Sequence, residues 1–94
     1  MKDSGELIKD LKDKDSSIRR HAIEMLGIIG DEIVIDALIQ VLKDKNRFVR
    51  QEAVTTLGKI GGERVVESLT QALGEEKDEF VQDSMRKVSE KLRK

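Results

Sequence analysis

The chain contains an internal repeat with a period of 31 residues. The segment Leu-Ile-Lys-Asp-Leu-Lys-Asp-Lys at residues 7–14 returns as Leu-Ile-Gln-Val-Leu-Lys-Asp-Lys at residues 38–45. Aligned at this offset, residues 7–37 and 38–68 are identical at 14 of 31 positions. A period of about 20 to 50 residues is typical of solenoids, in which each repeat buries its apolar face only against its neighbours. The sequence therefore predicts a stack of similar units.

Each unit reads as two helices joined by a short turn. Asp3 and Glu6 have the spacing of a capping box, and Asp15 is a second N-cap candidate. Gly30 and Gly61 follow the longer apolar runs and predict helix ends, since glycine accepts a left-handed conformation. The predicted helices cover residues 4–13 and 16–29, begin after Asp31 and Asn46 in the second unit, and begin near Glu63 and Asp78 in the third.

Apolar residues at helical spacing predict the core. The expected core residues are Leu7, Ile8, Leu11, Ile18, Ala22, Leu26, Ile29, Ile35, Leu38, Ile39, Leu42, Val49, Ala53, Leu57, Ile60, Val65, Val66, Leu69, Leu73, Phe80, Ser84, Met85 and Val88. The third unit is less similar, and its alignment at offset 31 pairs Val49 with Phe80. An offset of 32 would put Arg86 and Ser89 at the core positions of Val54 and Leu57, so we prefer 31.

The length fits a single domain, 1–94, with repeats at about 1–30, 31–61 and 62–94. Both ends differ from the middle. Residues 2–4 are polar where residues 33–35 are apolar, and at offset 31 Lys91 replaces Ile60. Since terminal repeats need polar outer faces, we expect a complete three-repeat protein.

Composition narrows the function classes. The chain has no cysteine, and 18 basic residues almost cancel 19 acidic ones, whereas nucleic-acid-binding domains usually carry a basic excess. No apolar run approaches the ~18 residues of a membrane span, and the N-terminus lacks the apolar region of a signal peptide. We therefore expect a cytoplasmic protein that binds neither nucleic acid nor membrane.

Two segments carry a family resemblance. Residues 15–32 and 46–61 resemble the short HEAT-type repeat of phycobilisome lyases, in which Asp-x-x-Val-Arg-x-x-Ala-x-x-x-Leu-Gly-x-Ile-Gly-Asp recurs. The resemblance implies an all-α fold, an α-α superhelix (HEAT-like solenoid) of three antiparallel helix pairs. It also implies that Arg19 and Arg50 pair with acidic residues of the adjacent turns, a row that Val81 ends. In this family the second helices typically line a concave face that binds proteins.

The residues give little support to an enzyme. The single histidine, His21, cannot build the paired His-Glu metal site of resembling diiron hydroxylases, and we expect it to be solvated. Ser16 and Ser17 stand at a helix start, where hydroxyls cap backbone N–H groups. Gly27 and Gly58 are expected to allow close helix packing. We expect no catalytic residue, no cofactor and no metal.

The candidate site is the non-core face of the second helices, where the two clear repeats agree least while their core positions match. Phe48 stands out, because Val49 already fills the core position and aromatic residues dominate interface hot spots. The candidate partner-binding residues are Arg20, Glu24, Ile28, Phe48, Gln51, Thr55, Lys59, Gln82 and Arg86.

Three functions remain at this stage. The favoured one is a non-enzymatic scaffold that binds a protein or peptide on the concave face of the second helices, with weak self-association left open. The alternatives are an accessory subunit of a lyase-type or other cofactor-handling enzyme, and a nucleic-acid-binding HEAT solenoid. The last would need basic residues to gather on the concave face, where Glu24, Glu79 and Glu90 are expected as well.

Overall fold

The structure, a computed structural model, describes residues 2–94, and these residues form six α-helices and no strand. The helices are α1 (Ser4–Asp10), α2 (Ser16–Ile29), α3 (Glu32–Val41), α4 (Arg47–Ile60), α5 (Glu63–Glu75) and α6 (Glu79–Leu92). Residue 1, where the expected domain and first repeat begin, lies outside the described part.

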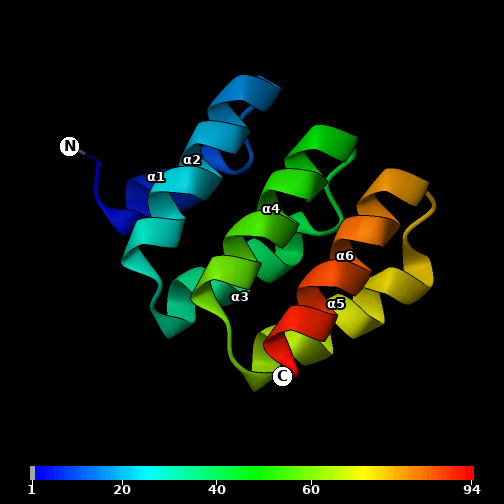
Figure 1. Cartoon of the computed structure of the whole chain (residues 1–94). Coiled ribbons are helices and arrows are strands. Elements are labelled where there is room, and N and C mark those ends of the chain that lie inside the picture. Colours follow the sequence, from blue (N-terminus) through cyan, green and yellow to red (C-terminus); the bar gives the residue numbers. More distant parts are fainter. Residues whose placement is uncertain (1) are drawn as a thin grey trace.

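The helices form two layers. Helices α2, α4 and α6 run side by side in one layer, and α1, α3 and α5 form the other behind them (Figure 1). In each repeat the first helix packs against the second: α1 against α2, α3 against α4, and α5 against α6. Helix α4 also packs against α2, α5 and α6. The prediction of an all-α solenoid of three helix pairs is confirmed.

The helix starts were predicted correctly from single residues. Asp3 and Glu6 form the full capping box, and the side chains of Asp15, Asp31, Asn46 and Asp78 each accept a backbone N–H in the first turn of their helices. The glycine ends are also confirmed, since both carry the positive φ that other residues avoid: 61° at residue 30 and 73° at residue 61.

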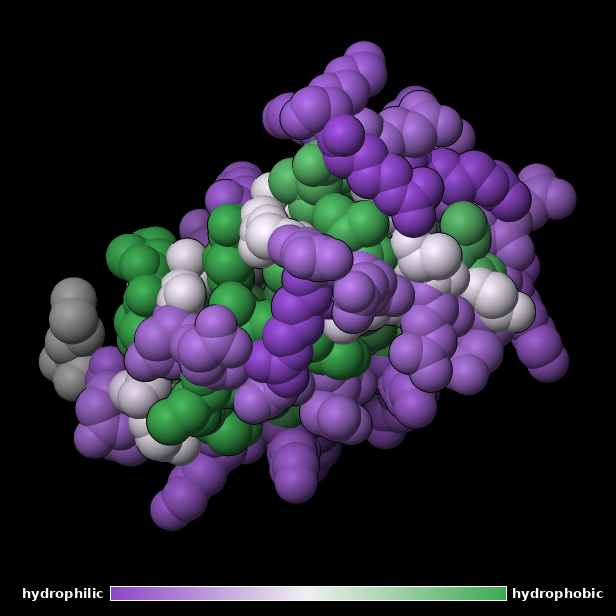
Figure 2. Space-filling view, turned by 90° about the horizontal axis from the view of Figure 1, so that it is seen from below, coloured by the Kyte–Doolittle hydropathy of each residue, from purple (hydrophilic) through white to green (hydrophobic). Residues whose placement is uncertain are grey.

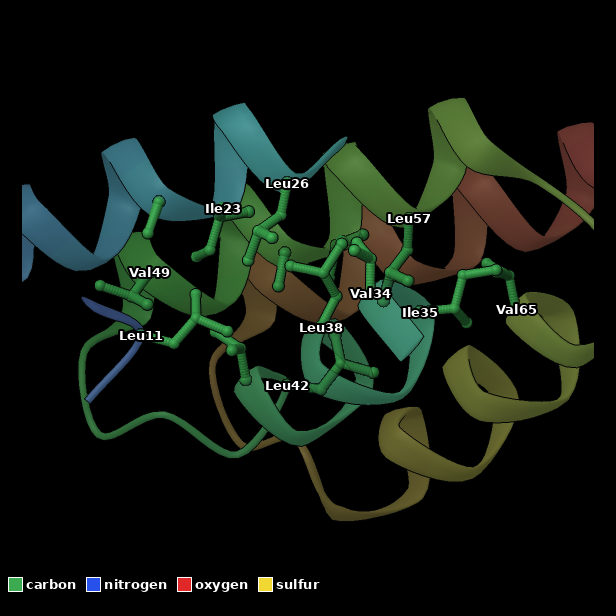
Figure 3. Packing of buried hydrophobic residues seen from close by; sticks show 14 of the residues in the cluster. Leu11, Ile23, Leu26, Val34, Ile35, Leu38, Leu42, Val49, Leu57 and Val65 are labelled. Atoms are coloured by element: carbon green, nitrogen blue, oxygen red, sulfur yellow. The ribbon is translucent and has the colours of Figure 1, made fainter. Parts of the chain in front are cut away.

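The core lies between the two layers and continues through all three repeats. Figure 3 shows Ile23 and Leu26 of α2, Leu38 of α3 and Leu57 of α4 pointing into this shared space. Most expected core residues of the first two repeats are buried or packed against the core. Because each repeat shares its core with the next, no repeat has a closed core of its own.

The offset chosen for the third repeat was wrong. The N-caps Asn46 and Asp78 are 32 positions apart, and Val81, not Phe80, takes the buried position of Val49. Phe80 is exposed and Ser84 is only partly buried. Of the residues predicted for the core of α6, Met85 is buried and Val88 is partly buried and packs against the core.

The extra residue belongs to the end of α5. Leu38 and Leu69, 31 positions apart, are equivalent buried residues, whereas Asp44 and Glu76, 32 positions apart, occupy the same place in their turns. Helix α5 accordingly has 13 residues where α3 has 10.

The two ends of the stack also differ from expectation. Ile18 and Ile29, expected in the core, remain 39% and 44% exposed, because no repeat precedes α2 in the structure. At offset 32 the equivalent of Ile60 is the apolar Leu92, not Lys91, and Leu92 packs against the core. The expected polar replacement at that position is therefore wrong.

Candidate functional site

Two arginines connect neighbouring repeats. The Arg19 guanidinium donates from Nε and Nη2 to the Asp44 carboxylate at 2.9 and 3.2 Å, and from Nη1 to the Asp13 carbonyl at 2.7 Å. Arg50 repeats this pattern with Glu76, at 2.8 and 3.1 Å, and with the Asp44 carbonyl at 2.8 Å. Each arginine thus ties its own turn to the next one, and the predicted structural role of both arginines is confirmed.

The row continues into the third repeat with a different residue. Gln82, not Val81, stands at the position of Arg50, and its Nε2 donates to the Glu76 carbonyl at 2.5 Å. Gln82 therefore keeps the bond within its own turn. The Gln82 side chain is shorter than arginine and carries no charge, so it cannot form the ion pair that Arg19 and Arg50 make with the next turn.

The outward surface of α2, α4 and α6, which we call the second-helix face, takes four residues from each helix. Its members are Ser17, Arg20, Glu24 and Ile28; Phe48, Gln51, Thr55 and Lys59; and Phe80, Asp83, Lys87 and Lys91. Seven of the nine predicted partner-binding residues lie here, and all but Gln51 are exposed. The other two do not: Gln82 lies in the α5–α6 turn network, and Arg86 lies at the position of Val54, on the far side of α6.

An aromatic cluster lies where α4 and α6 begin. The Arg47 guanidinium stands over the Phe48 ring at 5.4 Å and over the Phe80 ring at 5.9 Å, measured to the ring centroids. Its Nε also pairs with Asp78 at 3.2 Å. Both rings stay more than half exposed, Phe48 at 55% and Phe80 at 56%. These are the two aromatic residues of the chain, and neither serves the core.

The rest of the second-helix face is polar. Gln51 donates to the Ser84 hydroxyl at 2.7 Å and so joins α4 to α6. A shallow hollow of about 220 Å³ between α2 and α4 is lined by Ser17, Arg20, His21, Glu24 and Glu52. His21 is exposed, as expected.

A larger groove lies on the other layer and was not predicted. It measures about 610 Å³ and runs between α3 and α5 beside the paired Arg50 and Glu76. Its walls include Ile39, Gln40 and Gln71. The sequence held no signal for it, because these positions follow ordinary helical patterns and the longer α5 helps to shape the groove.

The described residues offer no metal site, since no three His, Cys, Asp or Glu side chains among residues 2–94 gather to hold an ion. Within the same part of the chain, no helix combines the length and apolar character required to span a membrane.

Comparison with protein families gives a match to the model for HEAT repeats over residues 5–88. Comparison with curated proteins gives no match. HEAT repeats are in general protein-interaction scaffolds, and the match does not distinguish the short phycobilisome-lyase type from other HEAT repeats. It covers nearly all of the chain and agrees with the stacked helix pairs and their arginine links. The chain therefore belongs to the HEAT-repeat family.

Proposed function

We propose that this chain is a non-enzymatic interaction module that binds a protein or peptide on the second-helix face, which we expect to be concave. The cluster of Phe48, Arg47 and Phe80 carries this proposal. Aromatic and arginine side chains supply most of the energy in protein interfaces, and they do so where the partner can exclude water around them.

The core of the fold does not use the two exposed rings. Val49 and Val81 fill the core positions next to them and are fully buried. Complete burial of a Phe side chain is worth about 1.5–3 kcal/mol, and these rings forgo roughly half of it. Two such rings at equivalent positions favour a surface that is buried on binding.

The charge of the face favours an acidic partner segment. Its four basic residues, Arg20, Lys59, Lys87 and Lys91, outnumber Glu24 and Asp83, although the whole chain carries a net charge of −1. Lys87 pairs with Asp83 at 3.0 Å in an exposed contact that solvent weakens. We therefore expect the partner to place an apolar side chain on the rings and acidic residues beside the lysines.

The test compares capture by the parent chain and by two variants, with lysate of the source organism. The site variant carries Phe48→Ala and Phe80→Ala, and the control carries Ile33→Ala, which truncates an exposed apolar residue in the other layer. Equal helicity by circular dichroism is required of all three. The captured protein is then purified and its affinity is measured directly.

We expect the parent and the control to bind equally and the site variant to bind at least about 30-fold more weakly, since hot-spot truncations cost ~2 kcal/mol or more. Equal binding by all three would contradict the assignment and direct attention to the groove between α3 and α5. A partner that binds only at low salt and proves to be nucleic acid would favour the nucleic-acid alternative. A chromophore or metal that co-purifies with the chain would favour the cofactor-handling alternative.

A further inference from the structure

The edge of α2 that faces away from α4 has the residues of a stacking interface, and no helix of residues 2–94 packs against it. Ile18 is equivalent to Val49 and Val81, which are fully buried, yet Ile18 is 39% exposed. Ile29 is equivalent to Ile60 and remains 44% exposed. Between them, Met25 is equivalent to Thr56 and Val88.

The contacts between α2 and α4 and between α4 and α6 show which residues of a neighbouring helix pack against such an edge. A Cβ added at Gly27 would lie 2.4 Å from Thr56, and one at Gly58 would lie 2.8 Å from Val88. The preceding helix thus places a glycine against the residue equivalent to Met25. The glycine follows the linking arginine by eight residues in both cases, from Arg19 to Gly27 and from Arg50 to Gly58.

The same edge carries an acceptor for that arginine. Asp13, Asp44 and Glu76 hold equivalent places, since each accepts the backbone N–H two residues later, at 2.8, 2.9 and 3.0 Å. The carboxylates of Asp44 and Glu76 also receive an arginine from the preceding repeat. Among residues 2–94, no basic side chain pairs with the Asp13 carboxylate.

The opposite end of the chain does not match this edge. On α6, Gln82, Arg86 and Glu90 stand where α4 has Arg50, Val54 and Gly58. A second copy stacked head to tail would bring neither the arginine nor the glycine, and it would bury two charged side chains. In Figure 2, hydrophobic residues reach the surface toward the end formed by the first repeat.

We propose that the edge formed by Asp13, Ile18, Met25 and Ile29 binds a helix of another HEAT-like protein, which carries an arginine in its first turn and a glycine eight residues later. Asp13 receives the guanidinium in two parallel hydrogen bonds, and the three apolar residues cover the helix between arginine and glycine. This surface is separate from the second-helix face and does not depend on the proposed function.

The probe is a full-length donor chain whose C-terminal edge is rebuilt to match that of the second repeat. It carries Gln82→Arg, Arg86→Val and Glu90→Gly, and its own N-terminal edge is blocked with Ile18→Lys and Ile29→Lys. The acceptor is the unmodified chain. Binding is measured by calorimetry and analytical ultracentrifugation, after circular dichroism has compared the helicity of both chains.

We expect a 1:1 complex of donor and acceptor. The substitution Asp13→Asn in the acceptor is expected to weaken it about tenfold, because it removes a charge-assisted bidentate pair. The substitution Ile29→Lys in the acceptor is expected to abolish it. A donor that keeps Gln82 and is otherwise the same is the matched control and is expected to bind about as weakly as the Asp13→Asn acceptor.

A peptide of residues 46–61, the sequence of α4, provides a second probe should the donor lose helicity. It carries Arg50 and Gly58, and its binding is followed by NMR of the unmodified chain at the methyl groups of Ile18, Met25 and Ile29. Saturable shifts confined to these methyl groups support the proposal. A folded donor that does not bind overturns it, as does a peptide that leaves these signals unmoved or shifts other methyl groups instead. Dimerisation of the unmodified chain that Ile29→Lys abolishes also overturns it, because the occupant would then be a second copy.

Discussion

At the scale of single residues, the contact between Arg50 and Glu76 holds a carboxylate in a buried position. The Glu76 side chain is 3% exposed, and its carboxylate accepts from the arginine and from the Asp78 backbone N–H. A buried carboxylate keeps its charge cheaply only while its partner is present. Removing the arginine should therefore cost more than the contact itself contributes.

The substitution Arg50→Met is expected to lower the free energy of unfolding by about 2–4 kcal/mol, since it leaves the Glu76 charge without compensation. Adding Glu76→Gln is expected to recover much of this loss, because an amide oxygen can still accept from Asp78 and carries no charge. Urea unfolding measures both. The control is Arg64→Met, which removes exposed contacts to Glu32 and Asp36 and should cost less than ~1 kcal/mol. A double variant no more stable than Arg50→Met would contradict this account.

At the scale of helices, close approach between second helices depends on glycine. The substitution Gly27→Ala is expected to destabilise the chain by about 1–3 kcal/mol, because its Cβ would lie 2.4 Å from the Thr56 Cγ2 and Thr56 is buried. Thr56→Ser removes that methyl group, so the two changes together should cost less than their sum. Thermal and urea unfolding of the single and double variants measure the coupling.

Gly74 is the matched control for this prediction. It lies inside α5, and a Cβ added there would meet nothing within 4 Å. Gly74→Ala should therefore stabilise the chain by up to ~1 kcal/mol through helix propensity alone. If Gly27→Ala also stabilised the chain, the requirement for close packing would be refuted.

The same scale explains what could be predicted from the sequence. The helix starts and the core of the second repeat followed from N-cap residues and apolar spacing, because that repeat has neighbours on both sides. Prediction failed in the first and third repeats because each of them has a neighbouring repeat on one side only in the structure. Arg86 was judged incompatible with the place of Val54, yet no repeat follows α6 in the structure, so that place faces solvent. Ile18 and Ile29 were judged buried, but within residues 2–94 no further helix packs on that edge of α2, and both stay partly exposed.

The candidate site was predictable only in part. Phe48 was identified because Val49 already filled the core position, and the exposed ring agrees with that reasoning. Phe80 was missed as its counterpart, since the offset of 31 assigned it to the core. Because of the same offset, Gln82 and Arg86 were predicted as partner-binding residues where the structure has Asp83 and Lys87 on the second-helix face. A one-residue extension of α5 changed every position after it, and no residue type in that helix signals such an extension.

At the scale of the whole molecule, stability should be highest in the middle of the stack. Repeat proteins are stabilised by each repeat and by its contacts with its neighbours alone, and the second repeat has neighbours on both sides. Helix α4 packs against four other helices, whereas α1, with seven residues, packs against α2 and α3. Local opening should therefore begin at the ends, where fewer contacts are lost.

Native-state hydrogen exchange tests this expectation. Amides in the middle of α4, such as those of Ala53, Val54 and Leu57, are expected to exchange slowest and to report global unfolding. Amides of α1 are expected to exchange at least about tenfold faster, since a short terminal helix can open while the rest stays folded. Measurements at two pH values establish that the rates reflect the opening equilibrium. Equal protection in all six helices would instead mean that three repeats unfold as one unit, and that contacts between repeats outweigh the difference between middle and end.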